Sequence, residues 1–177
     1  MKQELEEQLG VEFPKIFKNL PYIETDDGWF ELIRELCTTI QSHIDYTQKY
    51  FELNSEYNKA LVKSLTEGPE HLARYYNKLS NATPEYVIKW AQEEYDKKRF
   101  KDLIPPCPQV TAVQVKEKFG ILTFYYDGGD NAVNAAVDAA RQRSTTICEF
   151  CGEPGILYYK GWIKTLCKTH AKEFDYI

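Results

Sequence analysis

Three cysteines and one histidine near the carboxyl end constrain the fold of this chain more than any other feature. They form the pairs Cys148-x-x-Cys151 and Cys167-x-x-His170, with fifteen residues between them. Two ligands three positions apart on a tight turn can face one ion, and structural zinc sites use Cys and His in such pairs. The spacing therefore predicts one structural Zn²⁺ held by all four side chains. Because protein atoms fill every coordination position, we expect this metal to stabilise the fold rather than activate a water.

The residues between the two pairs predict a zinc ribbon that covers residues 144–177. Two short apolar runs between Ile156 and Leu166 flank Lys160-Gly161, which is typical of a tight hairpin turn. A short helix is expected from Cys167 to Phe174. A hairpin with one short helix has little core of its own, so metal binding should supply much of its folding free energy.

The rest of the chain, residues 1–143, predicts a mainly helical α+β body. Apolar residues spaced by three and four between Trp29 and Ile44 indicate an amphipathic helix, and Thr83-Pro84-Glu85 is a typical helix start. Further helices are expected at residues 1–9, 69–79 and 131–143. A proline-rich linker precedes two β-branched runs, 110–115 and 121–126, which predict a β-hairpin. Because isolated two-stranded pieces are marginal, we expect this hairpin and the ribbon to share one sheet.

Composition indicates a folded protein of a reducing compartment. The 177 residues are 43% hydrophobic and 14% aromatic, which is enough for a real core. The amino terminus is acidic and no apolar stretch follows it, so no signal peptide or membrane span is expected. Five cysteines, an odd number with three in a metal pattern, fit the cytoplasm better than a disulfide framework. The predicted location is cytoplasmic.

The charge distribution disfavours bulk binding of nucleic acid. The formal net charge is −5, although residues 141–177 hold six Lys and Arg against four acids. Phosphates repel an acidic protein, and few basic side chains are available to displace counterions from the nucleic acid. A local contact through the ribbon, with Lys160, Trp162, Lys164 and Lys168, stays open as an alternative.

Catalytic signatures are absent from the sequence, so no catalytic residue and no organic cofactor is predicted. The chain has three histidines, and it lacks a Gly-x-Ser-x-Gly elbow, a phosphate loop and a Cys/His dyad at a recognisable spacing. Cys107 stands among prolines without an identifiable catalytic partner. The turn Asp127-Gly128-Gly129-Asp130 is interpreted as a connection rather than as a phosphate site. An enzyme is therefore the less favoured class.

Three motifs in this order resemble a family of small, largely uncharacterised bacteriophage, prophage and bacterial proteins. They are Gly28-Trp29-Phe30 with a following leucine, Gln114-Val115-Lys116-Glu117-Lys118-Phe119-Gly120 with Phe124-Tyr125, and the Cys-x-x-Cys to Gly161-Trp162-x-x-Thr165-Leu166-Cys167-x-x-His170 segment. The resemblance covers residues 11–47 and 109–172. It implies a cytoplasmic, zinc-containing accessory protein. Ile121 and Thr123 depart from the family's hairpin, which reads Phe-Gly-Gly-Leu-Arg-Phe, and residues 48–108 look like a helical insertion.

The predicted fold class is α+β: a helical N-terminal part with a helical insertion, a β-hairpin plus helix, and a C-terminal zinc ribbon. The favoured function is a non-catalytic accessory protein that binds a protein, for example a host protein as an inhibitor or counter-defence factor. The alternative is a nucleic-acid-binding regulator that uses the ribbon, and a small-ligand sponge or metal-dependent hydrolase ranks third. No membrane partner is expected. The candidate partner-binding residues are aromatic or basic: Tyr75, Tyr76, Lys160, Trp162 and Lys164.

Overall fold

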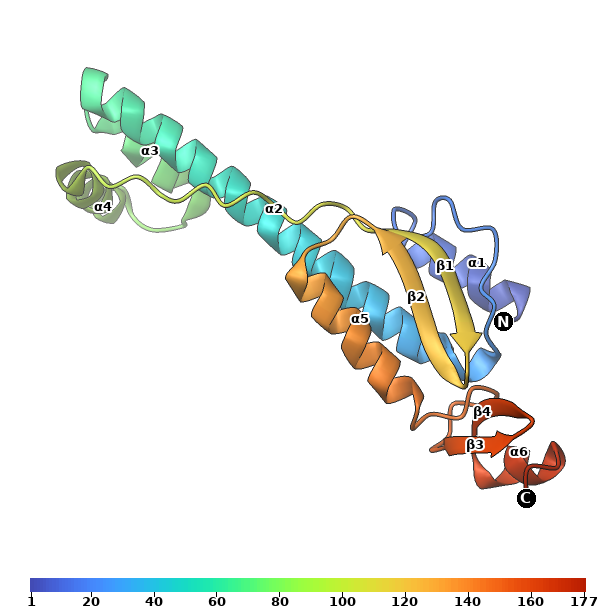
Figure 1. The fold of residues 1–177 in the computed structure, drawn as a ribbon. Coiled ribbons are helices and arrows are strands. Elements are labelled where there is room, and N and C mark those ends of the chain that lie inside the picture. Colours follow the sequence, from blue (N-terminus) through green and yellow to red (C-terminus); the bar gives the residue numbers. More distant parts are fainter. The chain divides into compact units, whose positions relative to one another are not determined.

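The computed structural model describes residues 1–177 and has the predicted α+β architecture (Figure 1). The helices are α1 (Gln3–Glu12), the 3₁₀ turn η1 (Asp27–Trp29), α2 (Phe30–Glu67), α3 (Glu70–Leu79), α4 (Pro84–Lys97), α5 (Asn131–Ser144) and α6 (Lys168–Glu173). The strands are β1 (Thr111–Lys118), β2 (Ile121–Asp127), β3 (Ile156–Lys160) and β4 (Trp162–Leu166). The fold class predicted from the sequence is thus confirmed.

The chain divides into two compact units. The first holds Met1–Asp45 and Cys107–Ile177, and the second holds Tyr46–Pro106. The predicted insertion, residues 48–108, overlaps the second unit, and the ribbon segment, residues 144–177, lies within the first. The candidate metal ligands therefore all belong to the first unit.

Helix α2 extends well past Ile44, where the apolar spacing predicts its end. It runs for 38 residues to Glu67 and stops before Gly68, which adopts a φ of 123°. No glycine or proline interrupts this stretch. Polar side chains four positions apart bond to each other beyond Ile44, as Gln48 does with Glu52 at 2.6 Å, and such pairs stabilise a helix.

Helix α1 continues through Gly10, although the sequence predicts that it ends there. A glycine inside a helix costs only about 0.5–1 kcal/mol, and Leu9 beside it is fully buried. The helix ends at Glu12 because Phe13 precedes Pro14, and a residue before proline avoids helical dihedral angles.

The first unit is built around the antiparallel β1–β2 hairpin. Helix α5 packs on β2, and Arg143 of α5 pairs with Glu35 of α2 at 2.7 Å (Figure 1). The segment before η1 adds to β1, because the Glu24 N–H donates to the Val115 carbonyl at 2.8 Å. Buried side chains from α1, α2, α5 and the hairpin form one core.

The expectation that the two hairpins share a sheet is wrong. Strands β1–β2 and β3–β4 form two separate antiparallel sheets. Side chains connect the hairpins instead: the buried Thr165 hydroxyl donates to the Gly120 carbonyl at 2.6 Å, and the Lys164 ammonium lies 3.4 Å from the Glu117 carboxylate. Strand pairing between the hairpins is therefore not needed to hold the ribbon in place.

The second unit has a small core of its own. Tyr57 and Leu61 of α2, Leu72 of α3 and Ala91 of α4 are buried together. The buried Ser64 hydroxyl accepts a hydrogen bond from the Leu72 amide at 3.0 Å, which fixes the start of α3 against α2. After α4 the chain returns along α2, where the carbonyls of residues 101 and 102 accept side-chain amide hydrogen bonds.

Candidate metal centre

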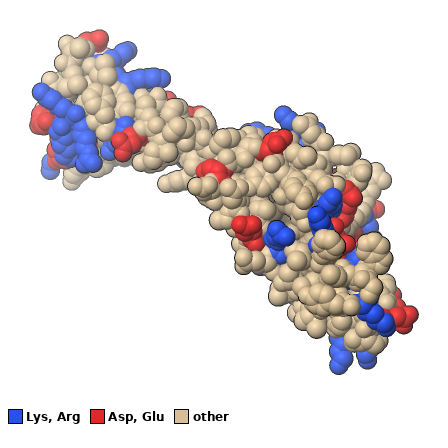
Figure 2. Space-filling view, in the orientation of Figure 1, with Lys and Arg blue, Asp and Glu red and all other residues tan.

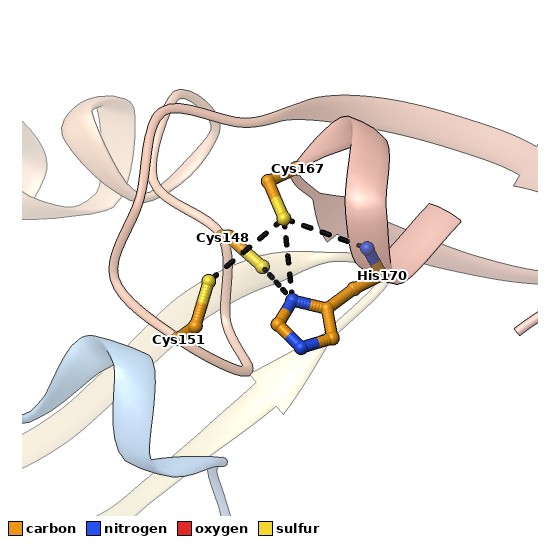
Figure 3. A group of neighbouring side chains, drawn as sticks. All are labelled: Cys148, Cys151, Cys167 and His170. Atoms are coloured by element: carbon orange, nitrogen blue, oxygen red, sulfur yellow. Dashed lines mark hydrogen bonds between the residues drawn. The ribbon is translucent and has the colours of Figure 1, made fainter. Parts of the chain in front are cut away.

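The four predicted ligands lie side by side at one end of the β3–β4 hairpin (Figure 3). One ligand atom from each of Cys148, Cys151, Cys167 and His170 lies within 4.8 Å of all the others. The Nδ1 atom of His170 is 3.5 Å from the Cys148 sulfur and 3.2 Å from the Cys167 sulfur. The Cys151 and Cys167 sulfurs are 3.8 Å apart.

These separations fit a tetrahedral zinc site. Zinc–sulfur bonds of about 2.3 Å and a zinc–nitrogen bond of about 2.0 Å place two sulfurs about 3.8 Å apart and sulfur and nitrogen about 3.5 Å apart. The observed distances of 3.8, 3.5 and 3.2 Å match this geometry closely. The group can therefore hold one metal ion with the preferences of Zn²⁺, and all four coordination positions come from the protein.

Local structure orients each ligand pair. Cys148 and Cys151 lie on a turn closed by the Gly152 N–H, which donates to the Cys148 carbonyl at 2.9 Å, and Gly152 has a φ of 81°. Cys167 is the N-cap of α6, and its sulfur accepts the His170 N–H at 3.5 Å. The single residue Gly161, with a φ of 74°, connects β3 to β4 and sets the register that brings both pairs together.

The electrostatic environment favours a thiolate at Cys167. The hydrogen bond from the His170 backbone lowers the pKa of the Cys167 thiol to about 6. Desolvation raises the pKa of Cys151 to about 11. A bound cation would ionise both sulfurs, because a coordinating thiol loses its proton. An aromatic shell packs on the fourth ligand, with the Phe150 ring 4.5 Å from the His170 ring.

The segment that contains Gly28 and Trp29 packs directly on the first ligand pair, which spacing alone did not predict. The Gly28 N–H donates to the Glu149 carbonyl at 2.7 Å, and the buried Trp29 indole donates to the Ile147 carbonyl at 2.9 Å. A Cβ on Gly28 would lie 2.2 Å from the Cys148 carbonyl oxygen, so only glycine fits. The sequence offered one signal for this contact: both segments are among the three motifs that resemble one protein family.

An ion pair between Glu149 and Lys164 stabilises the ribbon. Glu149 is 2% exposed, and its carboxylate lies 2.8 Å from the Lys164 ammonium. Burial raises the pKa of Glu149, and the ion pair opposes that change. Desolvation lowers the pKa of Lys164, but the hydrogen bond to Glu149 and the negative charges of Glu149, Glu117 and Asp26 together outweigh it and leave the pKa raised. Lys164 also approaches Glu117 of β1 at 3.4 Å, so its charge is largely balanced within the protein.

The other candidate partner-binding residues fall into two environments. Tyr75 and Tyr76 are half-buried and pack edge-to-face on Tyr57 in the second unit, with ring centroids 5.6 and 6.5 Å away. Trp162 is 84% exposed at the hairpin turn, and the Lys160 ammonium donates to the Asp175 carbonyl. Their role in partner binding stays a prediction.

Comparisons with protein-family models, with curated proteins and with solved structures found no match. None of the helices combines the length and the apolar character needed to cross a bilayer.

Proposed function

We propose that this chain is a non-catalytic protein with one structural Zn²⁺, and that it acts by binding another protein. The fit of the Cys148, Cys151, Cys167 and His170 cluster to a closed tetrahedral site supports zinc. A site with four protein ligands leaves no position for a reacting water, so the role of the metal is to stabilise the hairpin that binds the partner.

The observation that carries the binding proposal is the high exposure of two aromatic side chains near the turn of the β3–β4 hairpin. Trp162 is 84% exposed and Tyr159 is 75% exposed, on either side of the Gly161 turn. Ile156 at the other end of β3 is also exposed. Tryptophan and tyrosine are the residues that most often dominate binding energy at interfaces, and a metal-fixed hairpin presents them with little loss of entropy.

The resemblance to bacteriophage and prophage proteins gives this proposal its biological setting. In that setting the partner is a host protein, and the chain acts as an inhibitor or counter-defence factor in the host cytoplasm. The support is the order of the three motifs, two of which meet in space where Gly28 packs on the Cys148–Cys151 turn.

Affinity capture from bacterial extract tests the proposal. The bait with Tyr159→Ala and Trp162→Ala should lose a protein that the unmodified bait retains, while its zinc content stays the same. A bait with Tyr22→Ala and Tyr46→Ala is the matched control, because both tyrosines are exposed and lie outside the ribbon. Equal capture by all three baits would reject the ribbon as the binding surface.

The distribution of basic side chains supports nucleic-acid binding as a second candidate function, through the second unit rather than the ribbon. Lys and Arg side chains gather over α3 and α4 (Figure 2). Lys59 and Lys63 of α2 and Arg74 and Lys78 of α3 line one groove in the second unit, together with Glu56. Such a cluster suits a phosphate backbone better than Lys164, whose charge is paired with Glu149.

Fluorescence anisotropy with a single-stranded and a double-stranded DNA at low salt tests this second candidate. Even non-specific binders reach a Kd of about 1–100 μM at physiological salt, so binding in that range is expected. Replacing Lys63 and Lys78 with Gln should weaken it, whereas Lys160→Gln should not. Absence of binding at about 100 μM protein would refute nucleic-acid binding, since non-specific affinity usually falls within about 1–100 μM.

A further inference from the structure

A second cluster of metal-ligating side chains lies in the first unit, outside the zinc ribbon. His43 of α2, Cys107 and Asp130 each offer one ligand atom, and these atoms lie within 4.8 Å of one another. The His43 Nε2 atom is 2.8 Å from the Asp130 Oδ2 atom. Cys107 is buried, whereas the side chains of His43 and Asp130 are 29% and 39% exposed.

The glycine turn after β2 brings two of these residues together. The Gly129 N–H donates to the Pro108 carbonyl at 3.1 Å, which holds the turn beside Cys107. Gly128 has a φ of 83°, and a Cβ there would lie 2.2 Å from the Gln109 carbonyl oxygen. This close approach explains the two glycines without a bound phosphate.

The Asp130 carboxylate is held in a fixed orientation. As the N-cap of α5, its Oδ1 atom accepts the backbone N–H groups of Ala132 at 2.9 Å and Val133 at 3.1 Å. Its other oxygen is thereby directed toward His43. A ligand oriented by the backbone in this way loses little entropy when it binds an ion.

The order of the three groups argues against a nucleophilic cysteine. In a Cys/His/Asp triad the imidazole stands between the thiol and the carboxylate. Here the carboxylate contacts the imidazole and also hydrogen-bonds to the Cys107 thiol. Burial, followed by the charge of Asp130, raises the pKa of Cys107 to about 11, so the thiol keeps its proton at neutral pH unless a cation binds.

We propose that His43, Cys107 and Asp130 form a second site for a divalent first-row transition metal such as Zn²⁺, with an open fourth position. One thiolate and one carboxylate balance the double positive charge, and a neutral imidazole completes the set. Coordination opens the His43–Asp130 contact from 2.8 Å to about 3.3 Å, which half-exposed side chains can accommodate. A set with sulfur and imidazole disfavours Mg²⁺ and Ca²⁺.

The second site differs from the ribbon site in ligand number and in expected affinity. Three protein ligands with a solvent-accessible fourth position are the arrangement found in catalytic zinc sites. The positive end of the α5 helix dipole opposes a cation at this site. With one ligand fewer as well, this site should release its metal to a chelator before the ribbon does. The inference does not depend on the proposed protein-binding function.

Titration of the metal-free, reduced protein with Co²⁺, followed by thiolate-to-cobalt absorption, tests the site. The unmodified chain should bind two equivalents, and the single variants His43→Gln, Cys107→Ser and Asp130→Asn should each bind one. Loss of an outer hydrogen-bond partner alone typically costs 10–100-fold in metal affinity, so loss of a ligand should cost more than about 100-fold. Asp130→Asn keeps a residue that caps α5, so its loss of metal would not reflect fraying of the helix.

Matched variants separate this site from the ribbon and from general effects. Cys37→Ala removes a buried thiol of α2 outside the cluster and His71→Gln removes a histidine of the second unit, so both should still bind two equivalents. Cys167→Ser should abolish the ribbon equivalent and leave the other. A single equivalent in the unmodified chain would overturn the proposal, as would two equivalents in all three ligand variants.

Alkylation of Cys107 gives an independent readout that does not depend on the variants. Two equivalents of Zn²⁺, added to the metal-free protein, should slow the reaction of Cys107 with iodoacetamide, as measured by peptide mass mapping of the unmodified protein. The same rate with and without the metal would overturn the proposal.

Discussion

Replacing Gly28 with Ala is expected to separate the amino-terminal segment from the metal centre. The new methyl group would lie 2.2 Å from the Cys148 carbonyl oxygen, 2.4 Å from the Gly152 nitrogen and 2.6 Å from the Cys151 nitrogen. All three atoms belong to the backbone of the ligand turn, so no flexible side chain can move aside. The main chain itself must shift.

The structure gives the size of the effect. Overpacking against a rigid neighbour typically costs about 1–3 kcal/mol. The shift also breaks the Gly28 N–H hydrogen bond to the Glu149 carbonyl, which contributes about 1 kcal/mol. The expected loss is therefore about 2–4 kcal/mol in the free energy of unfolding. For a chain of this length that corresponds to a Tm lower by about 4–16 °C.

Thermal unfolding of the zinc-loaded protein by circular dichroism measures the change, and hydrogen exchange locates it. Exchange should rise at residues 26–30 and 147–152 and stay unchanged at residues 46–106. Gly10→Ala is the matched control, because a Cβ there meets nothing within 4 Å. That substitution, inside a helix, should stabilise the protein by about 0.5–1 kcal/mol.

The reasoning is refuted if Gly28→Ala is as stable as Gly10→Ala. It is also refuted if the loss of protection appears in the second unit rather than around the ligand turn.

Three further predictions concern separate parts of the fold. Removal of metal by a chelator should raise hydrogen exchange in β3, β4 and α6 while residues 46–106 keep their protection, because the second unit has its own core. Tyr57→Phe removes a phenol O–H whose single proton is shared between the Glu94 carboxylate and the Arg99 carbonyl, and it should destabilise the second unit by about 1–2 kcal/mol in urea unfolding. Tyr46→Phe, at an exposed ring, should not. Ser144→Ala leaves a buried amide of β2 without an acceptor and should cost about 1–3 kcal/mol; an equal result for the exposed Ser42→Ala would contradict this.

The sequence predicted which four side chains lie together in the ribbon because the geometry of this segment is local. Two ligands three residues apart on a turn, and two more at the start of a helix, need only one hairpin between them to meet. That hairpin was itself marked by two apolar runs around Gly161. The helix starts near Glu70, Pro84 and Asn131 were also close to their predicted positions, since proline and capping residues act on the nearest turn.

Contacts between distant segments were beyond the same reasoning. His43 and Asp130 are joined by a hydrogen bond across 87 positions, and no spacing rule relates them. The packing of Gly28 on Cys148 joins residues that are also far apart in the sequence. The predicted end of α2 at Ile44 was wrong because Tyr50, Leu53, Tyr57 and Leu61 continue the same three-and-four spacing of apolar residues. The predicted shared sheet is replaced by side-chain contacts, such as the hydrogen bond from the Thr165 hydroxyl to the Gly120 carbonyl.

X-ray absorption at the zinc edge of the Cys107→Ser variant tests the central claim most directly, because that variant reports the ribbon site alone. The account predicts one zinc per chain with three sulfur neighbours at about 2.3 Å and one nitrogen at about 2.0 Å. A shell of oxygen and nitrogen atoms only, or less than stoichiometric zinc in folded protein, would contradict it.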